Sequence, residues 1–281
     1  MKEIKNKLFP NERDLYASRD LKLISCRFEG KEDGESALKE SENISILNCF
    51  FDLRYPLWHV SNLTIDNSEF TPNSRAAIWY SNNINIKNST LFGIKAIREC
   101  KDLTLDNVEI NSPEFGWKSA QILAKNIKLD SEYAFLETKN VSINNMLFSG
   151  KYSFQYCQNV TISNSVLDTK DCFWHSKNVV IKDSTIKGEY LAWYSENLTF
   201  INCKITGTQP FCYAKKLKLI NCTMEGCDLA FEYSDVDADI KSSIESIKNP
   251  YKGKIIVKKV NNLILTKDSK YPFECEIIET N

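Results

Sequence analysis

A short pattern that recurs about every nineteen residues constrains this chain more than any other feature. The pattern reads Asn, apolar, any residue, apolar, any residue, Asn or Asp, a small residue, any residue and apolar, as in NVTISNSVL and NLTFINCKI. From Val141 to Leu217, the first apolar residue of each copy follows the previous one by nineteen residues. Such periodicity is typical of repeat proteins, in which each unit buries its apolar face only by stacking on its neighbours.

The copies before Val141 are less regular. Their first apolar residues are Leu21, Ile44, Leu63, Ile84, Leu103 and Ile127, so the steps vary from 14 to 24 residues and insertions are expected between units. Within each copy the runs are short, β-branched and alternate between apolar and polar residues, which predicts strands, and no segment shows helical periodicity. The sequence therefore predicts an all-β solenoid of about eleven coils with parallel strands about 4.8 Å apart.

The domain organisation follows from where the pattern starts and stops. Residues 1–20 are polar and irregular and are expected to form an N-terminal cap, residues 21–234 the coils, and residues 235–281 a C-terminal cap. No linker interrupts the chain, so a single domain over 1–281 is predicted.

Asparagine replaces the glycine and proline that usually make turns. The chain has 27 Asn, 9 Gly and 7 Pro. Two asparagine columns recur at fixed places in the repeat, where the side chain tolerates a left-handed bend and its amide can bond the amide in the next coil. The columns are Asn43, Asn62, Asn83, Asn126, Asn140, Asn159, Asn178 and Asn197, then Asn48, Asn67, Asn88, Asn107, Asn145, Asn164, Asn202 and Asn221.

Composition excludes several classes of function. The formal net charge of -1 gives no electrostatic basis for binding nucleic acid. No apolar run is long enough for a membrane-spanning helix, and the first 20 residues lack the apolar region of a secretory signal, so a cytoplasmic protein is expected. Ten cysteines without a CxxC pair are then read as reduced, buried thiols, and neither a metal nor a cofactor is predicted.

Several stretches resemble a known group of proteins. GESALKES, YPLWHVSNLTI, AAIWYSNNINI, CFWHSKNVVI, GEYLAWYSENLTFINC and AFEYSDVDADIKSSIESIKNP are similar to an uncharacterised bacterial family, a domain of unknown function with a right-handed parallel β-helix of the pectate-lyase-like kind. The resemblance covers roughly residues 8–280. It implies the right-handed parallel β-helix fold and no activity.

Two adjacent columns before the first asparagine corner could form a binding surface. The Trp column reads Lys39, Trp58, Trp79, Arg98, Leu136, Gln155, Trp174, Trp193 and Cys212. The Tyr column reads Glu40, His59, Tyr80, Glu99, Glu137, Tyr156, His175, Tyr194 and Tyr213. Aromatic faces suit stacking against sugar rings, and charged neighbours suit hydroxyls or carboxylates. The sequence thus indicates a glycan-binding groove formed by Trp58, His59, Trp79, Tyr80, Arg98, Trp174 and Trp193.

Catalysis in this groove is a separate hypothesis. Glu99 and Glu137 lie about two coils apart in one column, near the upper limit of about 9.5 Å for a glycosidase pair. Lys39 and Glu40 are the further candidates for a base or acid on the first coil of the column. Whether the protein is an enzyme is left open by the sequence.

Three interpretations stay open at this point. The first is the carbohydrate-binding groove, with or without a reaction. The second is an interaction scaffold or homo-oligomer that uses the aromatic face, and the oligomeric state is not predicted. The third is a metal or redox role for the cysteines. The alternative to all three is that the aromatic columns have no binding role and form an exposed sheet face whose charges keep the protein in solution.

Overall fold

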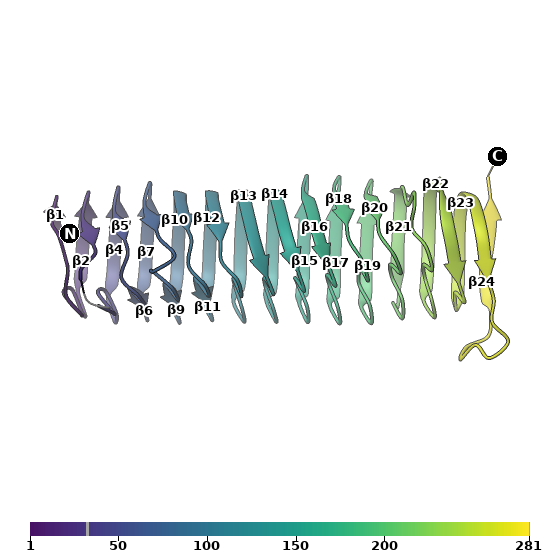
Figure 1. Cartoon of the computed structure of the whole chain (residues 1–281), viewed down its shortest axis with the longest axis horizontal. Coiled ribbons are helices and arrows are strands. Elements are labelled where there is room, and N and C mark those ends of the chain that lie inside the picture. The colour runs from purple at the N-terminus through teal and green to yellow at the C-terminus, as the bar shows by residue number, and fades with distance from the viewer. Residues whose placement is uncertain (32–33, 281) are drawn as a thin grey trace. The chain divides into compact units, whose positions relative to one another are not determined.

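The computed structural model describes residues 1–31 and 34–280 of the chain. These residues form two compact units, which divide between Met146 and Leu147. In each unit the chain winds through flat coils whose strands run side by side (Figure 1). Every element in the described part of the chain is a strand, turn or bend, and no helix is present there.

The strands of the first unit are short at the start and longer from β10 onwards. They are β1 (Lys2–Lys5), β2 (Arg19–Ile24), β3 (Arg27–Phe28), β4 (Glu42–Leu47), β5 (Phe50–Phe51), β6 (Leu57–Trp58), β7 (Ser61–Asp66), β8 (Glu69–Phe70), β9 (Ile78–Trp79), β10 (Asn82–Leu91), β11 (Ile97–Arg98), β12 (Lys101–Asn111) and β13 (Ala120–Glu132). Strand β14 (Lys139–Lys151) begins in this unit and ends in the second.

The second unit continues with the same kinds of strand. They are β15 (Gln158–Ser163), β16 (Val166–Lys170), β17 (Lys177–Lys182), β18 (Thr185–Lys187), β19 (Glu196–Ile201), β20 (Lys204–Thr206), β21 (Leu217–Cys222), β22 (Asp235–Lys248), β23 (Lys252–Ile264) and β24 (Glu274–Glu279).

All strand pairs in both units are parallel, which confirms the predicted β-solenoid. The first apolar residues of consecutive copies are direct partners, as Leu63 is of Ile84 and Val160 is of Val179. Equivalent side chains therefore lie one above another on adjacent coils. In the first unit the strands β6, β9 and β11 add a separate narrow sheet, where the second unit has turns.

One copy of the repeat lies in a different register from the one predicted. Leu103 pairs with Ile122 and Val108 pairs with Ile127, so Ile122 is the first apolar residue of its coil. Asn126 accordingly belongs to the second asparagine column: the Asn145 amide donates to its oxygen at 2.8 Å. The apparent steps of 24 and 14 residues around Ile127 become two steps of nineteen, because the stretch AQILAKNIKLD matches the apolar pattern twice.

Taken over both units, the described residues form about 15 turns rather than eleven. The additional turns come from the segments expected to be caps. Strand β1 pairs in parallel with β2, and β22, β23 and β24 pair in parallel with the strands before them. The expected caps therefore contain coils whose outermost strands leave an edge open. The single domain expected over 1–281 stays a prediction.

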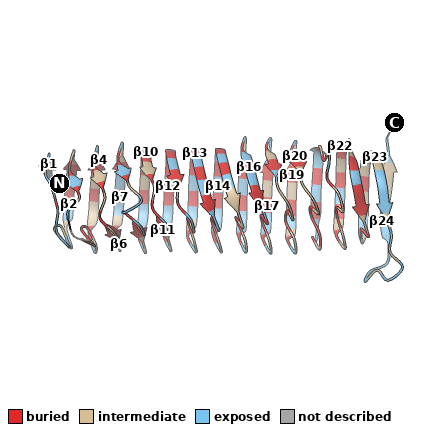
Figure 2. Ribbon diagram, viewed as in Figure 1, coloured by how far each residue is buried: buried red, intermediate tan, exposed pale blue. Residues whose placement is uncertain are grey.

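Burial alternates along the strands as an in-out pattern requires (Figure 2). The two apolar positions of each copy are almost fully buried, and the phenylalanines of the core stack from coil to coil. Phe28, Phe51 and Phe70, for example, have ring centroids 4.5 and 4.4 Å apart. Large apolar side chains thus fill the space inside each unit.

Left-handed backbone marks the asparagine corners of the coils between Asp20 and Asn221. The asparagines of both columns have φ between 45° and 58°, and the positions without asparagine, such as Asp102 and Gln121, share this conformation. Their amides form ladders: Asn62 donates to Asn43 at 2.8 Å in the first unit, and Asn197 donates to Asn178 at 2.8 Å in the second. The predicted role of asparagine at the bends is confirmed.

Candidate functional site

The two adjacent columns differ in how they face the solvent. Side chains of the Trp column are half-buried or buried, whereas those of the Tyr column are exposed apart from half-buried Tyr213. The Tyr column also has left-handed backbone throughout, with φ from 51° to 62°. This corner turns each side chain outward, so the Tyr column is the surface that a ligand would meet.

Each tryptophan is held by a hydrogen bond to the next coil. The indole Nε1 atoms of Trp58 and Trp79 donate to the carbonyl oxygens of Ala76 and Lys95 at 2.7 Å. Trp174 and Trp193 donate in the same way to carbonyl oxygens of the following coil, also at 2.7 Å. The indoles stack as well, with interplanar angles of 3° for both pairs. Their donors and most of their faces are therefore occupied within the protein.

In the first unit, cations enclose the indole stack. The Lys39 ammonium lies 5.8 Å from the ring centroid of Trp58, and the Arg98 guanidinium lies 5.2 Å from that of Trp79. Arg98 is also 5.3 Å from Trp117 on the other side and within 3.3 Å of a Glu99 oxygen. Cation–π contacts and this ion pair thus engage Lys39 and Arg98 with the indoles of the Trp column.

Glu99 and Glu137 lie two coils apart in the Tyr column, as the sequence predicts. The backbone N–H of Glu99 bonds the carbonyl of Trp117, and that of Lys118 bonds the carbonyl of Leu136, so Lys118 occupies the coil between Glu99 and Glu137. The two carboxylates therefore belong to coils that are not adjacent. Glu40, at the start of the column, is exposed. His59 stacks on Tyr80 with centroids 5.0 Å apart, and this exposed pair occupies the two coils between Glu40 and Glu99.

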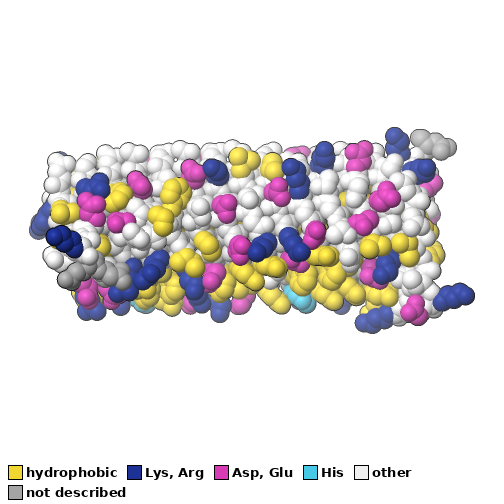
Figure 3. Space-filling model, viewed as in Figure 1, with side chains coloured by type: hydrophobic (Ala, Val, Ile, Leu, Met, Phe, Trp, Pro, Cys, Tyr) yellow, Lys and Arg dark blue, Asp and Glu magenta, His cyan; other side chains and the backbone are white. Residues whose placement is uncertain are grey.

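The second unit has a longer aromatic ladder. Tyr156, His175, Tyr194 and Tyr213 follow one another at steps of nineteen residues. Their consecutive ring centroids are 5.0, 5.1 and 4.5 Å apart, with interplanar angles of 3°, 8° and 11°. Figure 3 shows hydrophobic side chains with a histidine among them along the lower border of this part of the chain. Ring edges, with their hydroxyls and imidazole nitrogens, face outward.

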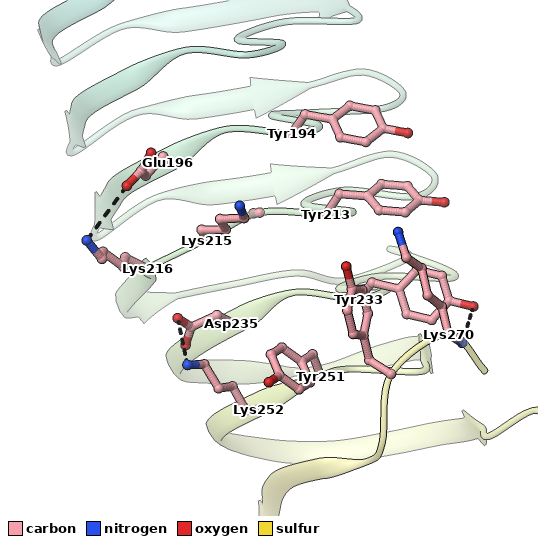
Figure 4. A pocket seen from close by; sticks show the side chains of 12 residues that line it. Tyr194, Glu196, Tyr213, Lys215, Lys216, Tyr233, Asp235, Tyr251, Lys252 and Lys270 are labelled. Atoms are coloured by element: carbon pink, nitrogen blue, oxygen red, sulfur yellow. Dashed lines mark hydrogen bonds and ion pairs between the residues drawn. The ribbon is translucent and has the colours of Figure 1, made fainter.

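The ladder ends at a hollow of about 400 Å³ (Figure 4). The next tyrosine, Tyr233, follows Tyr213 by twenty residues, and its ring is tilted by 55° at 5.6 Å. The stack therefore stops, and the face of Tyr213 turned away from Tyr194 has no parallel ring on it. Tyr251 and Tyr271 line the other side, with centroids 5.0 Å apart, and the Tyr271 ring is edge-on to Tyr233 at 5.5 Å.

Positive charge dominates the hollow. Four lysines and two acidic residues line it. Glu196 is within 3.7 Å of the Lys216 ammonium, and Asp235 is within 3.7 Å of that of Lys252. Lys215 and Lys270 have no carboxylate partner in the part of the chain that the structure describes. The hollow therefore has two cations that are not neutralised.

Burial raises the pKa of the Tyr213 phenol to about 12, and the negative charge of Glu232 adds to the effect. Tyr213 is thus a neutral hydroxyl at physiological pH, which can donate or accept a hydrogen bond. Glu232 is itself held by the Lys248 ammonium at 2.9 Å. The hollow consequently offers neutral phenols and ammonium groups to a ligand.

The cysteines are buried, so their thiols do not contribute to this surface. All ten are buried thiols, and burial raises the pKa of Cys100, Cys212 and Cys227 to about 12. Thiols in this state are poor nucleophiles and poor metal ligands. Among residues 1–31 and 34–280, no cluster of three or more His, Cys, Asp or Glu side chains could hold a metal ion. Nor does any helix in that range have the length and apolarity to cross a membrane.

Sequence reasoning located part of this site. It placed Tyr194 and Tyr213 in the Tyr column and Trp193 beside them, and it missed Tyr233, Tyr251 and Tyr271. The motif FEYSD, which repeats the FCYAK of the previous coil, could have extended the column to Tyr233. Tyr251 and Tyr271 reach the hollow through a shorter coil and the β23–β24 loop, for which the repeat gives no signal.

Fold and site together define a parallel β-solenoid with an exposed aromatic ladder that leads into a tyrosine- and lysine-lined hollow. The chain belongs to the family described as "Protein of unknown function (DUF3737)", whose model matches residues 2–278. A comparison with curated proteins gave no match.

Among solved structures, the chain is similar to PfbA, a surface adhesin of Streptococcus pneumoniae, at 10% identity over 92% of this chain and 82% of that one, with a TM-score of 0.35. It is also similar to the A-module of the mannuronan C-5 epimerase AlgE4 of Azotobacter vinelandii, at 8% identity over 99% and 89% of the two chains, with a TM-score of 0.35. A third is the pentapeptide repeat protein HetL of Nostoc, at 11% identity over 78% and 91%, with a TM-score of 0.26.

Proposed function

We propose that the protein binds an acidic carbohydrate in the hollow between Tyr213, Tyr251 and Tyr271. The observation that carries the proposal is the combination of five tyrosines with two lysines, Lys215 and Lys270, that lack a carboxylate partner in the described part of the chain. The phenol rings that line the hollow suit the apolar face of a sugar ring, and an ammonium suits a uronate carboxylate or a sulfate.

The volume and chemistry of the hollow support a ligand of this class. About 400 Å³ lies within the range of small-molecule sites, and the phenol hydroxyls supply the oriented polar groups that sugar hydroxyls need. A neutral sugar would leave the two ammonium groups without a partner. This proposal moves the binding residues from Trp58, Trp79 and Trp174, whose indoles are stacked and hydrogen-bonded, to the tyrosines that line the hollow.

Binding without catalysis is the function that the geometry supports. Lys118 stands between Glu99 and Glu137, and Lys39 and Glu40 belong to the same unit as those residues rather than to the hollow. Catalysis by these four residues is therefore no part of the proposal. The proposal does include three predictions from the sequence: the pectate-lyase-like subtype, the right-handed winding and the cytoplasmic location.

Calorimetric titration with matched acidic and neutral oligosaccharides tests the proposal. We expect heat of binding with oligogalacturonate or a sulfated oligosaccharide and none with a neutral hexaose. The double variant Lys215→Ala, Lys270→Ala should lose about a hundredfold or more in affinity, because each of the two charge-assisted hydrogen bonds contributes about 1.5 to 3 kcal/mol.

Lys204→Ala is the matched control, because Lys204 is an exposed lysine of β20 that does not line the hollow. Its affinity should equal that of the wild type. A hexaglutamate peptide forms the second comparison. Binding of that peptide as tightly as the sugar, or no binding of any acidic sugar, would overturn the proposal.

A further inference from the structure

The aromatic ladder in front of the hollow has a row of polar groups without protein partners. The hydroxyls of Tyr156, Tyr194 and Tyr213 make no hydrogen bond to any residue that the structure describes. Tyr156 and Tyr194 are 51% and 45% exposed, so their hydroxyls reach the solvent. A phenylalanine would stack as well as a tyrosine in these places. What the hydroxyls add is an outward donor and acceptor on successive coils.

The spacing of these groups is set by the stacking of the coils. Ring centroids along the ladder are 4.5 to 5.1 Å apart, and the rings are almost parallel. A pyranose ring in an extended chain has a comparable length, so each coil could offer one polar group to one sugar unit. Ring faces in the ladder are covered by the neighbouring rings, so contact there is by hydrogen bonding rather than by stacking.

The ladder is also continuous with the hollow. Tyr194 and Tyr213 are members of the ladder and line the hollow as well (Figure 4). A chain with one end in the hollow would therefore meet Tyr194, then His175, then Tyr156 as it extends. The polar groups at each step are a phenol or an imidazole, both of which bond hydroxyls.

We infer that the ligand is a linear oligosaccharide whose acidic end unit lies in the hollow and whose next units run along the ladder towards Tyr156. This inference rests on the proposed function and adds the length and direction of the ligand. Three coil intervals separate Tyr213 from Tyr156, about 14 Å at about 4.8 Å each. The ladder accordingly accommodates about three sugar units beyond the one in the hollow.

Titration with a size series of one acidic oligosaccharide, from monomer to hexamer, tests the inference. The dissociation constant should fall with each unit up to about the tetramer and then stay constant, because the ladder ends. Tyr156→Phe keeps the stacked ring and removes only the far hydroxyl. We expect it to weaken binding of the tetramer about threefold to tenfold and to leave the monomer and dimer unchanged.

Two controls separate the ladder from the hollow. Tyr251→Phe, inside the hollow, should weaken binding of every length alike, and Tyr16→Phe, an exposed tyrosine of the first unit, should weaken none. A monomer that binds as tightly as the tetramer, with Tyr156→Phe equal to the wild type, would overturn the inference and leave the proposed function standing. Absence of binding at every length would remove both.

Discussion

The indole Nε1 of Trp193 donates a 2.7 Å hydrogen bond to the carbonyl oxygen of Gln209, sixteen residues further along the chain. The same bond recurs from Trp174 to Tyr190 in the preceding coil. Because the acceptor lies in the loop that leads into the next coil, each tryptophan ties its own coil to its neighbour. The Trp column is therefore a row of coil-to-coil links beneath the exposed Tyr column.

Replacing Trp193 by phenylalanine should destabilise the fold. The variant removes the donor to the Gln209 carbonyl and part of the stack with Trp174, whose centroid is 5.4 Å away. A loss of about 1 to 3 kcal/mol in the free energy of unfolding is expected, measured by urea denaturation. Tyr194→Phe, which removes only an outward hydroxyl, should change it by less than about 0.5 kcal/mol. Equal values for the two variants would contradict this role of the indole.

The asparagine ladder gives a second prediction. Asn178 has a left-handed φ of 57°, donates to Asn159 at 3.0 Å and accepts from Asn197 at 2.8 Å. Asn178→Ala should cost about 2 kcal/mol, because it loses both amide bonds and places a Cβ residue in strained backbone. Asn178→Gly should cost less, since glycine adopts this φ freely. If glycine were as damaging as alanine in urea denaturation, the backbone would not be the main reason for asparagine at the corner.

Two glycines with positive φ, Gly188 and Gly226, allow a matched pair of alanine variants to be compared. Gly188 has a φ of +143°, and a Cβ placed on it would overlap the carbonyl oxygen of Thr169 in the coil below. Gly226 has a φ of +73° and no atom within 4 Å of such a Cβ. Gly188→Ala should therefore fail to fold or lose more than about 3 kcal/mol, while Gly226→Ala should lose only about 1 kcal/mol. Similar thermal midpoints for the two variants would contradict the close approach of the coils at Gly188.

The repeat pattern predicted the fold because each of its columns has a single physical role. Alternating apolar residues fix which side chains point inward, and the asparagines fix the bends, so parallel stacking followed from spacing alone. The coil at Ile122 was missed because the same stretch satisfies the pattern at Ile127. The repeat pattern alone fits either Ile122 or Ile127 as the first apolar residue of the coil, and the pairing of Leu103 with Ile122 shows that it is Ile122.

The binding surface was less predictable for a related reason. Periodicity places Trp193 and Tyr194 side by side but does not tell which is exposed, because the left-handed corner at Tyr194 decides it. The hollow depends on departures from periodicity: twenty residues between Tyr213 and Tyr233, and a step of seventeen where Val236 pairs with Gly253. The repeat pattern predicts only the positions that recur every nineteen residues, and the hollow forms where this spacing changes.

Tyr213 makes the stability of the protein depend on pH in the alkaline range. Burial raises its pKa to about 12 in the folded protein, against about 10 in an unfolded chain. Below about pH 10 both states keep the proton, so the contribution is fully present there. Between about pH 10 and 12 the unfolded state releases the proton first, and the free energy of unfolding falls as the pH rises.

Comparison of the wild type with Tyr213→Phe isolates this contribution from the other groups that titrate in the same range. The stability of the wild type relative to the variant should be constant from pH 7 to about 9.5 and then decrease towards about pH 12. Absorbance of the phenolate gives an independent measurement, in which the variant should lack the last of the tyrosines to titrate. A difference in stability that stays constant with pH, together with an unchanged phenolate titration, would show that Tyr213 is as accessible to water as the rest of the Tyr column.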